Sequence, residues 1–195
     1  MDMTHLDDVQ LMRRVQQGDF GPFETLVARY RGPLLHAAWS KLGDSQWAED
    51  VVQEAFLAAF AARHTYDPSF SFRTWLWTIL LNLCRKQYKR REERPREIHF
   101  SPHTPVDVLP FAEPVSHETG LSRLLCAERK EELALCLAKL PEAQADALRL
   151  RFFGGLKFSE IAHVMDSSES AAKVRVRNGL AALALLLDAD EGAHS

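Results

Sequence analysis

The 195-residue sequence lacks the features that mark secreted, disulfide-bonded or membrane-spanning proteins. Its three cysteines, Cys84, Cys126 and Cys136, form no CxxC motif, and an odd number cannot all pair with one another. Such a widely spaced set predicts buried, inert thiols in a reducing compartment. No stretch approaches the roughly 20 uncharged apolar residues of a membrane span, and the acidic start of the chain lacks a signal-peptide apolar run. We therefore expect a cytoplasmic protein.

The sequence also lacks the residue groups that catalysis and metal binding require. None of its eight histidines belongs to an HExxH motif, and no His/Cys cluster has the spacing of zinc ligands. Its one notable pair of carboxylates has no nucleophile or phosphate-binding loop nearby. We expect no enzyme activity, no metal site and no cofactor.

Period-two alternation is missing as well, and apolar residues recur at helical spacing through most of the chain. Five of the nine prolines fall between Arg94 and Val115, where fixed φ angles and missing donors oppose a helix. The sequence therefore predicts an all-α fold of two small helical domains, residues 5–91 and 121–187, joined by a Pro-rich linker at 92–120. The C-terminal domain is expected to contain a helix-turn-helix.

The pattern predicts eight helices, with Asp19 as one candidate N-cap and either Asp44 or Ser45 as another. It also predicts a bend or a brief break at Gly32-Pro33 and a frayed tail after residue 187. The helices are expected at residues 5–17, 20–42, 45–63, 71–91, 121–139, 141–153, 159–165 and 169–187.

The helix expected at 71–91 carries one polar face opposite an apolar arc. The polar face gathers Thr74, Thr78, Asn82, Arg85, Lys86 and Lys89, with Trp75 among them. Residues 85–96 carry a net charge of +5, which leaves −8 for the rest of the chain. This composition is typical of a base-reading surface beside a phosphate track, although a solvated face remains the alternative. Trp75 favours binding, because a large aromatic on a polar face needs a partner.

The turn before this helix adds Tyr66 and Phe70, which could stack on an unpaired base or fill the small core. In the helix expected at 45–63, Asp50, Gln53 and Glu54 share one face, while Val52, Phe56 and Phe60 recur every four residues. The carboxylates form either an acidic face that docks on a protein or a plain solvated face.

Residues 158–165, a three-residue turn and residues 169–187 have helix-turn-helix spacing. The last helix is expected to bury a stripe of Ala172, Val176, Leu180, Leu183 and Leu187. Its other side, in the N-terminal half that would enter a major groove, carries Ser170, Ala171, Lys173, Val174, Arg175, Arg177 and Asn178. This motif indicates DNA binding, although many helical hairpins have the same spacing.

Together these segments resemble the extracytoplasmic-function (ECF) sigma factors, the short group of the sigma-70 family. The resemblance covers residues 8–91 and 121–187. AEDVVQEAF at 48–56 is similar to region 2.2 of that family, and Phe72, Arg73, Trp75, Leu76, Ile79 and Asn82 are similar to regions 2.3 and 2.4. The segments similar to region 4 are Leu140-Pro141, Leu148, Leu150-Arg151, Gly155-Leu156, Glu160-Ile161-Ala162 and Lys173-Val174-Arg175.

The resemblance implies three surfaces and three partners: core RNA polymerase, promoter DNA and an anti-sigma factor. The residues implied to dock on the clamp helices of the polymerase largest subunit are Asp50, Gln53, Glu54 and Phe56. Those implied to open and read the −10 element are Tyr66, Phe70, Arg73, Trp75, Thr78, Asn82, Arg85, Lys86, Lys89 and Arg90. Those implied to read the −35 element are Ser170, Ala171, Lys173, Val174, Arg175 and Arg177.

The sequence departs from the family pattern in the turn and in the last helix. Asp166 stands where the turn often has glycine, and aspartate tolerates a left-handed conformation better than most residues. Ala171-Ala172 replaces a usual Thr-Val, and Asn178 replaces a common arginine, so the −35 contact is expected to be weaker or altered. Two other interpretations remain. A helix-turn-helix regulator that does not bind polymerase would leave residues 48–56 unexplained, and a protein-interaction adaptor would leave Trp75 unexplained.

Overall fold

The computed structural model describes residues 6–92 and 132–193, and all regular structure within these ranges is helical. The all-α prediction is therefore confirmed. Nearly all of the expected linker, the first part of the helix expected at 121–139 and Cys126 lie outside the described residues. The described residues divide into an N-terminal unit, residues 6–92, and a C-terminal unit, residues 132–193.

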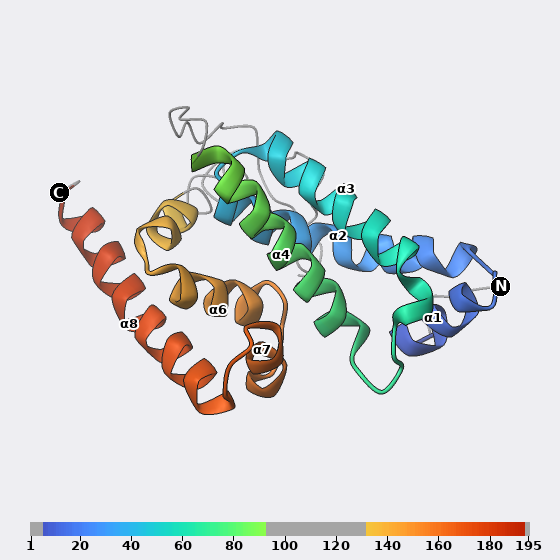
Figure 1. The fold of residues 1–195 in the computed structure, drawn as a ribbon. Helices are drawn as coiled ribbons and strands as arrows, with labels where there is room; N and C mark the ends of the chain where they lie inside the picture. The colour runs from blue at the N-terminus through green and yellow to red at the C-terminus, as the bar shows by residue number, and fades with distance from the viewer. Residues whose placement is uncertain (1–5, 93–131, 194–195) are drawn as a thin grey trace, which may run out of the picture.

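The N-terminal unit contains α1 (Asp8–Gln16), α2 (Gly21–Leu42), α3 (Ser45–Ala61), a short 3-10 helix (Arg63–Thr65) and α4 (Phe72–Glu92). In Figure 1, α3 and α4 cross in front of α2, and α1 closes one end. Side chains from all four helices form its core, including Leu11, Leu26, Leu34, Leu76 and Trp77.

Helix starts follow the capping chemistry of the sequence at two sites and depart from it at a third. The Asp44 carboxylate accepts a hydrogen bond from the Trp47 amide at 2.9 Å, which confirms Asp44 as the N-cap of α3. Asp7 and Gln10 form a reciprocal capping box that starts α1. Asp19, however, is not a cap: α2 begins after Phe20, with no side-chain hydrogen bond at its N-cap.

Two further expectations about helix length need correction. Of the bend or brief break expected at Gly32-Pro33, the break does not occur, because α2 continues to Leu42 with Pro33 inside it. Helix α8 (Glu169–Ala193) continues past residue 187, where the sequence suggested a frayed tail.

The C-terminal unit contains a helix described over residues 132–139, α6 (Glu142–Phe152), α7 (Phe158–Val164) and α8. Ile161, Ala162 and Val164 are buried, as helix-turn-helix packing predicts. Asp166 adopts φ = 46°, so the left-handed conformation expected in the turn is present.

The predicted buried stripe of α8 is only partly correct. Ala172 and Val176 are buried, but Leu180 is 42% exposed. Gly179 takes the inward position instead: a Cβ atom there would lie 3.0 Å from Leu148 of α6. The absence of a side chain at Gly179 lets α8 approach α6 closely, whereas Leu183 of the predicted stripe packs against the core and Leu187 is partly buried.

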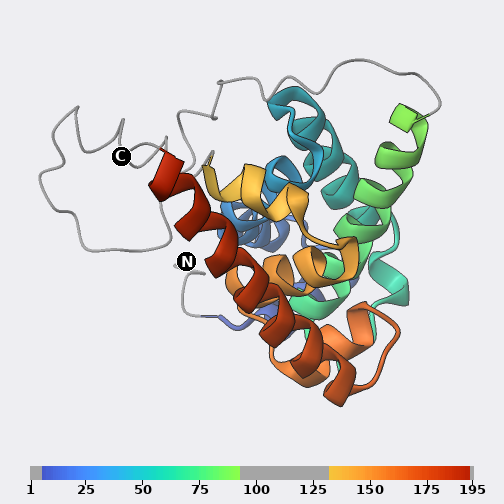
Figure 2. The same ribbon diagram turned by 90° about the vertical axis from the view of Figure 1, so that its left-hand side faces the viewer.

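The two units pack directly on one another, an arrangement that the sequence did not predict. Helix α7 lies against α4, and α6 lies between α8 and the N-terminal unit (Figures 1 and 2). A Cβ atom at Gly154, in the turn after α6, would lie 2.6 Å from the Leu150 carbonyl oxygen and 3.1 Å from the Trp77 ring. The clash with the backbone oxygen favours glycine in this turn, which packs closely on Trp77.

Candidate docking and nucleic-acid surfaces

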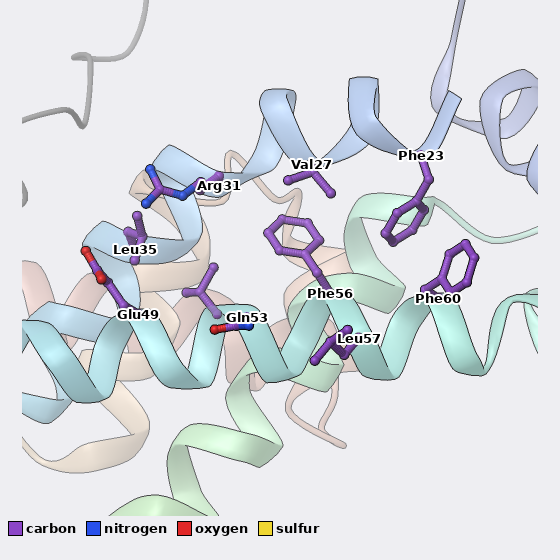
Figure 3. Close-up of a pocket in the computed structure, with 10 residues that line it drawn as sticks. Phe23, Val27, Arg31, Leu35, Glu49, Gln53, Phe56, Leu57 and Phe60 are labelled. Carbon is purple, nitrogen blue, oxygen red and sulfur yellow. The ribbon is translucent and has the colours of Figure 1, made fainter. Parts of the chain in front are cut away.

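An apolar groove of about 460 Å³ lies between α2 and α3. Figure 3 shows the Phe56 ring of α3 reaching up toward Val27 of α2, with Phe23 and Phe60 facing each other at one end. The rings of Phe23 and Phe60 pack edge to face with centroids 5.2 Å apart. The groove is therefore walled by well-packed side chains on both helices.

Polar side chains border this groove along α3. Gln53 lines it directly, together with Glu49 and Arg31 at its edge, whereas Asp50 and Glu54 are exposed on the same helix outside the lining. Of the four residues implied to bind polymerase, the structure thus places Phe56 and Gln53 in the groove and the two carboxylates beside it. An apolar hollow with a polar rim is the usual anatomy of a protein-binding surface.

Sequence reasoning missed the most exposed apolar residue of this surface. Leu57 lines the groove and is 63% exposed. It falls outside the four-residue repeat of Val52, Phe56 and Phe60, and that irregularity was the only available signal. An exposed apolar side chain beside an apolar groove is typical of an interaction surface, so Leu57 offers a further apolar contact to a partner.

At the end of the groove, Arg63 lies over two aromatic rings. Its guanidinium carbon is 4.7 Å from the Phe60 ring centroid and 5.4 Å from that of Phe20. Its Nη1 also donates a hydrogen bond to the Phe60 carbonyl oxygen at 3.0 Å. The Arg63 guanidinium therefore holds the Phe20 and Phe60 rings in place at the end of the apolar groove.

The polar face predicted on α4 is divided between solvent and the C-terminal unit. Asn82, Lys86, Lys89 and Arg90 are exposed. Thr74 is buried instead, and its hydroxyl donates a hydrogen bond to Glu160 of α7 at 3.0 Å. The remaining members of the predicted set, Arg73, Trp75, Thr78 and Arg85, are partly buried.

The turn before α4 keeps its two aromatic residues in different environments. Tyr66 is 3% exposed, its ring packs against Phe72 and Trp75, and its hydroxyl donates a hydrogen bond to the Phe70 carbonyl at 2.8 Å. Burial raises the pKa of Tyr66 to about 12. Of the two roles left open by the sequence, Tyr66 fills the core in this structure. Phe70 is 53% exposed and stacks on His163 of α7.

The N-terminal half of α8 presents a mixed polar and apolar face to solvent. Ser170, Lys173, Val174 and Arg177 are exposed, and Ala171 is partly buried. Lys173 pairs with Glu169 one turn earlier at 2.6 Å. Arg175 points elsewhere: it lines a small polar hollow between the two units. Two of the three predicted cations of this helix therefore remain on its outer face.

Within the described ranges, no group of three or more His, Cys, Asp or Glu side chains is arranged to hold a metal ion. The thiols of Cys84 and Cys136 are buried, as predicted, and burial raises the pKa of Cys84 to about 12. Across the same residues, none of the helices combines the length and hydropathy needed to span a bilayer.

Two family signatures match this chain. Sigma-70 region 2 matches residues 26–94, which include most of the groove lining and α4, and Sigma-70 region 4 matches residues 130–183, which include α6, α7 and most of α8. One signature thus falls in each of the two units.

Among curated proteins, the chain is 32% identical over 183 residues to the RNA polymerase sigma-H factor of Pseudomonas aeruginosa, covering 89% of this chain and 90% of that protein. It is 30% identical over 180 residues to the ECF RNA polymerase sigma-E factor of Escherichia coli K12, covering 88% and 89%.

Two solved structures are similar over most of the chain. One is CnrH in complex with the cytosolic domain of CnrY, with 29% identity, a TM-score of 0.70, and coverage of 94% of this chain and 98% of that one. The other is the sigma factor RpoE of Bartonella quintana in complex with the anti-sigma factor NepR, with 20% identity, a TM-score of 0.66, and coverage of 86% and 98%. The second likeness is one of fold.

Proposed function

The chain belongs to the extracytoplasmic-function RNA polymerase sigma factors of the sigma-70 family, and from this premise we propose a role for each of its surfaces. The N-terminal domain, residues 5–91, binds core RNA polymerase and opens the −10 element. The C-terminal domain, residues 121–187, binds the −35 element as duplex, and residues 92–120 link the two. The chain directs initiation without catalysing a reaction itself.

The groove between α2 and α3 is the proposed polymerase contact. Leu57 supplies exposed apolar surface that a partner helix would bury, Phe56 lines the groove while only 8% exposed, and Gln53 supplies hydrogen bonds at the edge. The exposed carboxylates of Asp50 and Glu54 lie beside it, where they favour a partner with basic residues. A groove of this shape suits an amphipathic helix.

The exposed part of the α4 face is the proposed −10 surface. Asn82 offers an amide that can hydrogen-bond a base edge, and Lys86, Lys89 and Arg90 continue along the same helix as phosphate contacts. Opening a duplex costs about 1.4 kcal/mol per base-pair step. Capturing an unpaired base on an aromatic recovers about 1–3 kcal/mol. A few captured bases, together with polymerase binding, therefore suffice to hold the element open.

Phe70, with its exposed ring, is the proposed stacking residue of the turn. Tyr66 supports it from the core, since the Tyr66 hydroxyl holds the Phe70 carbonyl. Release of Tyr66 from the core would be needed before it could itself contact a base.

The outer face of α8 is the proposed −35 surface. Lys173 and Arg177 are exposed cations near its N-terminal end, and Val174 offers an apolar contact for a thymine methyl group. Arg175 can join them only when it leaves the hollow between the two units.

An anti-sigma factor and a cytoplasmic location complete the proposal. The Bartonella quintana relative of the same fold was solved with an anti-sigma factor, and CnrH, similar over 94% of this chain, was solved with the cytosolic domain of CnrY. We infer that this chain is likewise held by a protein partner in the compartment where RNA polymerase works.

The observation that carries the proposal is the pairing of a rimmed apolar groove in one unit with exposed cationic helix faces in both units. Transcription in vitro with purified core polymerase and genomic DNA from the source organism tests it. The full chain should yield transcripts from specific start sites that core polymerase alone does not produce. The absence of any such transcript would refute the proposal.

A further inference from the structure

The contact between the two units is centred on a buried carboxylate. Asp146 of α6 has a side chain only 1% exposed. Its Oδ1 accepts hydrogen bonds from Lys41 Nζ of α2 at 2.8 Å and from Arg149 Nη1 of its own helix at 3.1 Å. The Nη2 atom of Arg85, on α4, lies 3.8 Å from the Oδ2 atom of Asp146. Cations from two helices of the N-terminal unit thus converge on one carboxylate of the C-terminal unit.

Arg149 extends this cluster back to α2. Its Nε donates to the Ser40 hydroxyl at 2.8 Å, and its Nη2 donates to the Ser40 carbonyl at 2.7 Å. That carbonyl belongs to the last turn of α2, where backbone oxygens have no partner within the helix. Lys41 also donates to Glu142 Oε1 at 2.8 Å. The hydrogen bonds of this cluster join the two units of the chain to each other directly, through side chains and one backbone carbonyl.

A second line of contacts joins α4 to the region around α7. Glu160 uses one oxygen to accept from the Thr74 hydroxyl and the other to accept from the Lys157 amide, which starts α7. Ring stacking completes the interface, with His36 on Phe153 and Phe70 on His163. Of the N-terminal partners, Phe70 belongs to the surface assigned above to the −10 element, and Thr74 lies on the same polar arc of α4.

The interface also withdraws one cation from each proposed DNA surface. Arg85 and Arg175 line the same polar hollow of about 150 Å³ between the units. Moreover, α4 and α7 are in direct contact, whereas the −10 and −35 elements are separate stretches of one duplex. Simultaneous binding to both elements therefore requires the units to separate.

We propose that the Asp146 cluster (Lys41, Arg85, Glu142, Asp146 and Arg149) is an intramolecular latch that holds the chain closed in a form that cannot engage a promoter. This inference rests on the proposed function, because it concerns the regulation of those same DNA surfaces. Polymerase and promoter DNA bind the open form and so draw the equilibrium toward it.

The chemistry of the latch makes it reversible. Buried charges regain their hydration when they separate. An ionic contact therefore contributes less net free energy than an apolar contact of equal size. Two buried donors in this region, Trp77 Nε1 and Arg175 Nη1, have no hydrogen-bond partner within the described part of the chain. Opening would let water satisfy both. The closed form is therefore held in place without being permanent.

Charge reversal at Lys41 tests the latch directly. In Lys41→Glu, a carboxylate faces Asp146 and Glu142, so the full chain should expand, measured as a larger radius of gyration by small-angle X-ray scattering. Arg13→Glu is the matched control, because Arg13 is exposed on α1 of the same unit and should leave the chain compact. Circular dichroism checks that helix content is retained. If Lys41→Glu loses helix, the milder Lys41→Met decides the question by the same measurement.

A functional readout separates the latch from the proposed function. If the closed form holds about 90% of the chain, opening should lower the concentration of factor needed for half-maximal transcription about tenfold. Lys41→Met should show this gain with core polymerase. A wild-type chain that transcribes while both Lys41 variants stay as compact as the control refutes the latch alone. A wild-type chain that yields no transcript refutes the proposed function, and scattering still tests the latch.

Discussion

Single buried polar groups decide which of the predicted contact residues are free to act. Tyr66 is the clearest case, because its aromatic side chain and its place in the chain suit base stacking as well as core packing. The hydroxyl settles the matter in this structure, because it finds an acceptor at the Phe70 carbonyl while the ring lies against Phe72 and Trp75. The buried Tyr66 thus shapes the turn that exposes Phe70.

Removing this hydroxyl should loosen the turn without unfolding the chain. Tyr66→Phe is expected to lower the free energy of unfolding by about 1 kcal/mol, because one hydrogen bond is lost and the ring contacts remain. Thermal denaturation followed by circular dichroism measures the change. Tyr88→Phe is the control, since Tyr88 is exposed and should leave the melting temperature unchanged. Equal melting temperatures for all three proteins would contradict the assigned role.

At the scale of the helix, each contact surface combines residues that share a face with residues that fall outside the expected pattern. On α3 the residues of the repeat at every fourth position line the groove, and Leu57 lines it too although it is out of phase with that repeat. On α4 the polar arc was correct as a pattern, but the C-terminal unit covers its edge at Thr74. Helical periodicity therefore identifies a face, whereas its accessibility depends on what packs there.

Leu57 should contribute to polymerase binding although it does little for folding. Burying a leucine side chain is worth about 1.5–3 kcal/mol, so Leu57→Ala is expected to weaken binding to core polymerase about tenfold or more. Competition binding with labelled core measures this. Leu185→Ala serves as control, because Leu185 is also highly exposed but lies on α8, away from the groove. Equal affinities of the two variants would exclude Leu57 from the contact.

Asn82 should matter for promoter opening rather than for polymerase binding, because it lies exposed on α4 and outside the groove lining. Asn82→Ala is expected to reduce open-complex formation, measured by permanganate reactivity of unpaired thymines, while core affinity stays at the wild-type value. Loss of both by the same factor would show that the amide does not read the −10 element.

Lys173 should contribute a phosphate contact. Lys173→Ala is expected to weaken binding of −35 duplex and to lower the slope of log affinity against log salt by about one unit. Its pair with Glu169 is exposed and adds little to stability, so the fold should not change. Lys157→Ala, an exposed lysine outside the outer face of α8, is the comparison. An unchanged salt slope would remove Lys173 from the DNA contact.

At the scale of the whole molecule, the two units meet through charges, and this makes their contact sensitive to acid. The hydrogen bond from Lys41 holds the pKa of Glu142 below its ordinary value of 4.5. Because the lowered pKa belongs to the closed form, the contribution of Glu142 is complete above pH 4.5 and is lost as the pH falls through that lowered pKa. Solvent screening keeps the effect small, since much of the Glu142 side chain is exposed.

Glu142→Gln should therefore differ from wild type at neutral pH and converge with it in acid. The measurement is the radius of gyration of both proteins across a pH titration. The neutral variant is expected to be slightly more open at neutral pH, and the difference should disappear at the acid end. Glu54→Gln, on the exposed side of α3, is the control. A difference between Glu142→Gln and wild type that does not depend on pH would contradict this assignment.

The sequence predicted most of the helices and many of the buried residues of both units, because these follow from local rules. Asp44 caps α3 through its own carboxylate, and Asp166 adopts the left-handed turn expected of it. The errors arise where a local rule met a competing contact. Leu180 is displaced from the packed stripe because Gly179 lets α8 approach Leu148.

By itself, the sequence determined that this chain is helical, that it has a cationic α4 and an apolar repeat on α3, and that it resembles one family. Periodicity, capping and charge act over a few residues and can be read in order along the chain. Only the tertiary structure decided which of those groups face solvent and which face each other. Asp146 and Lys41 stand more than a hundred positions apart, and no local pattern links them. Their pairing exists because two units, each folded by local rules, meet at surfaces that the chain order does not specify.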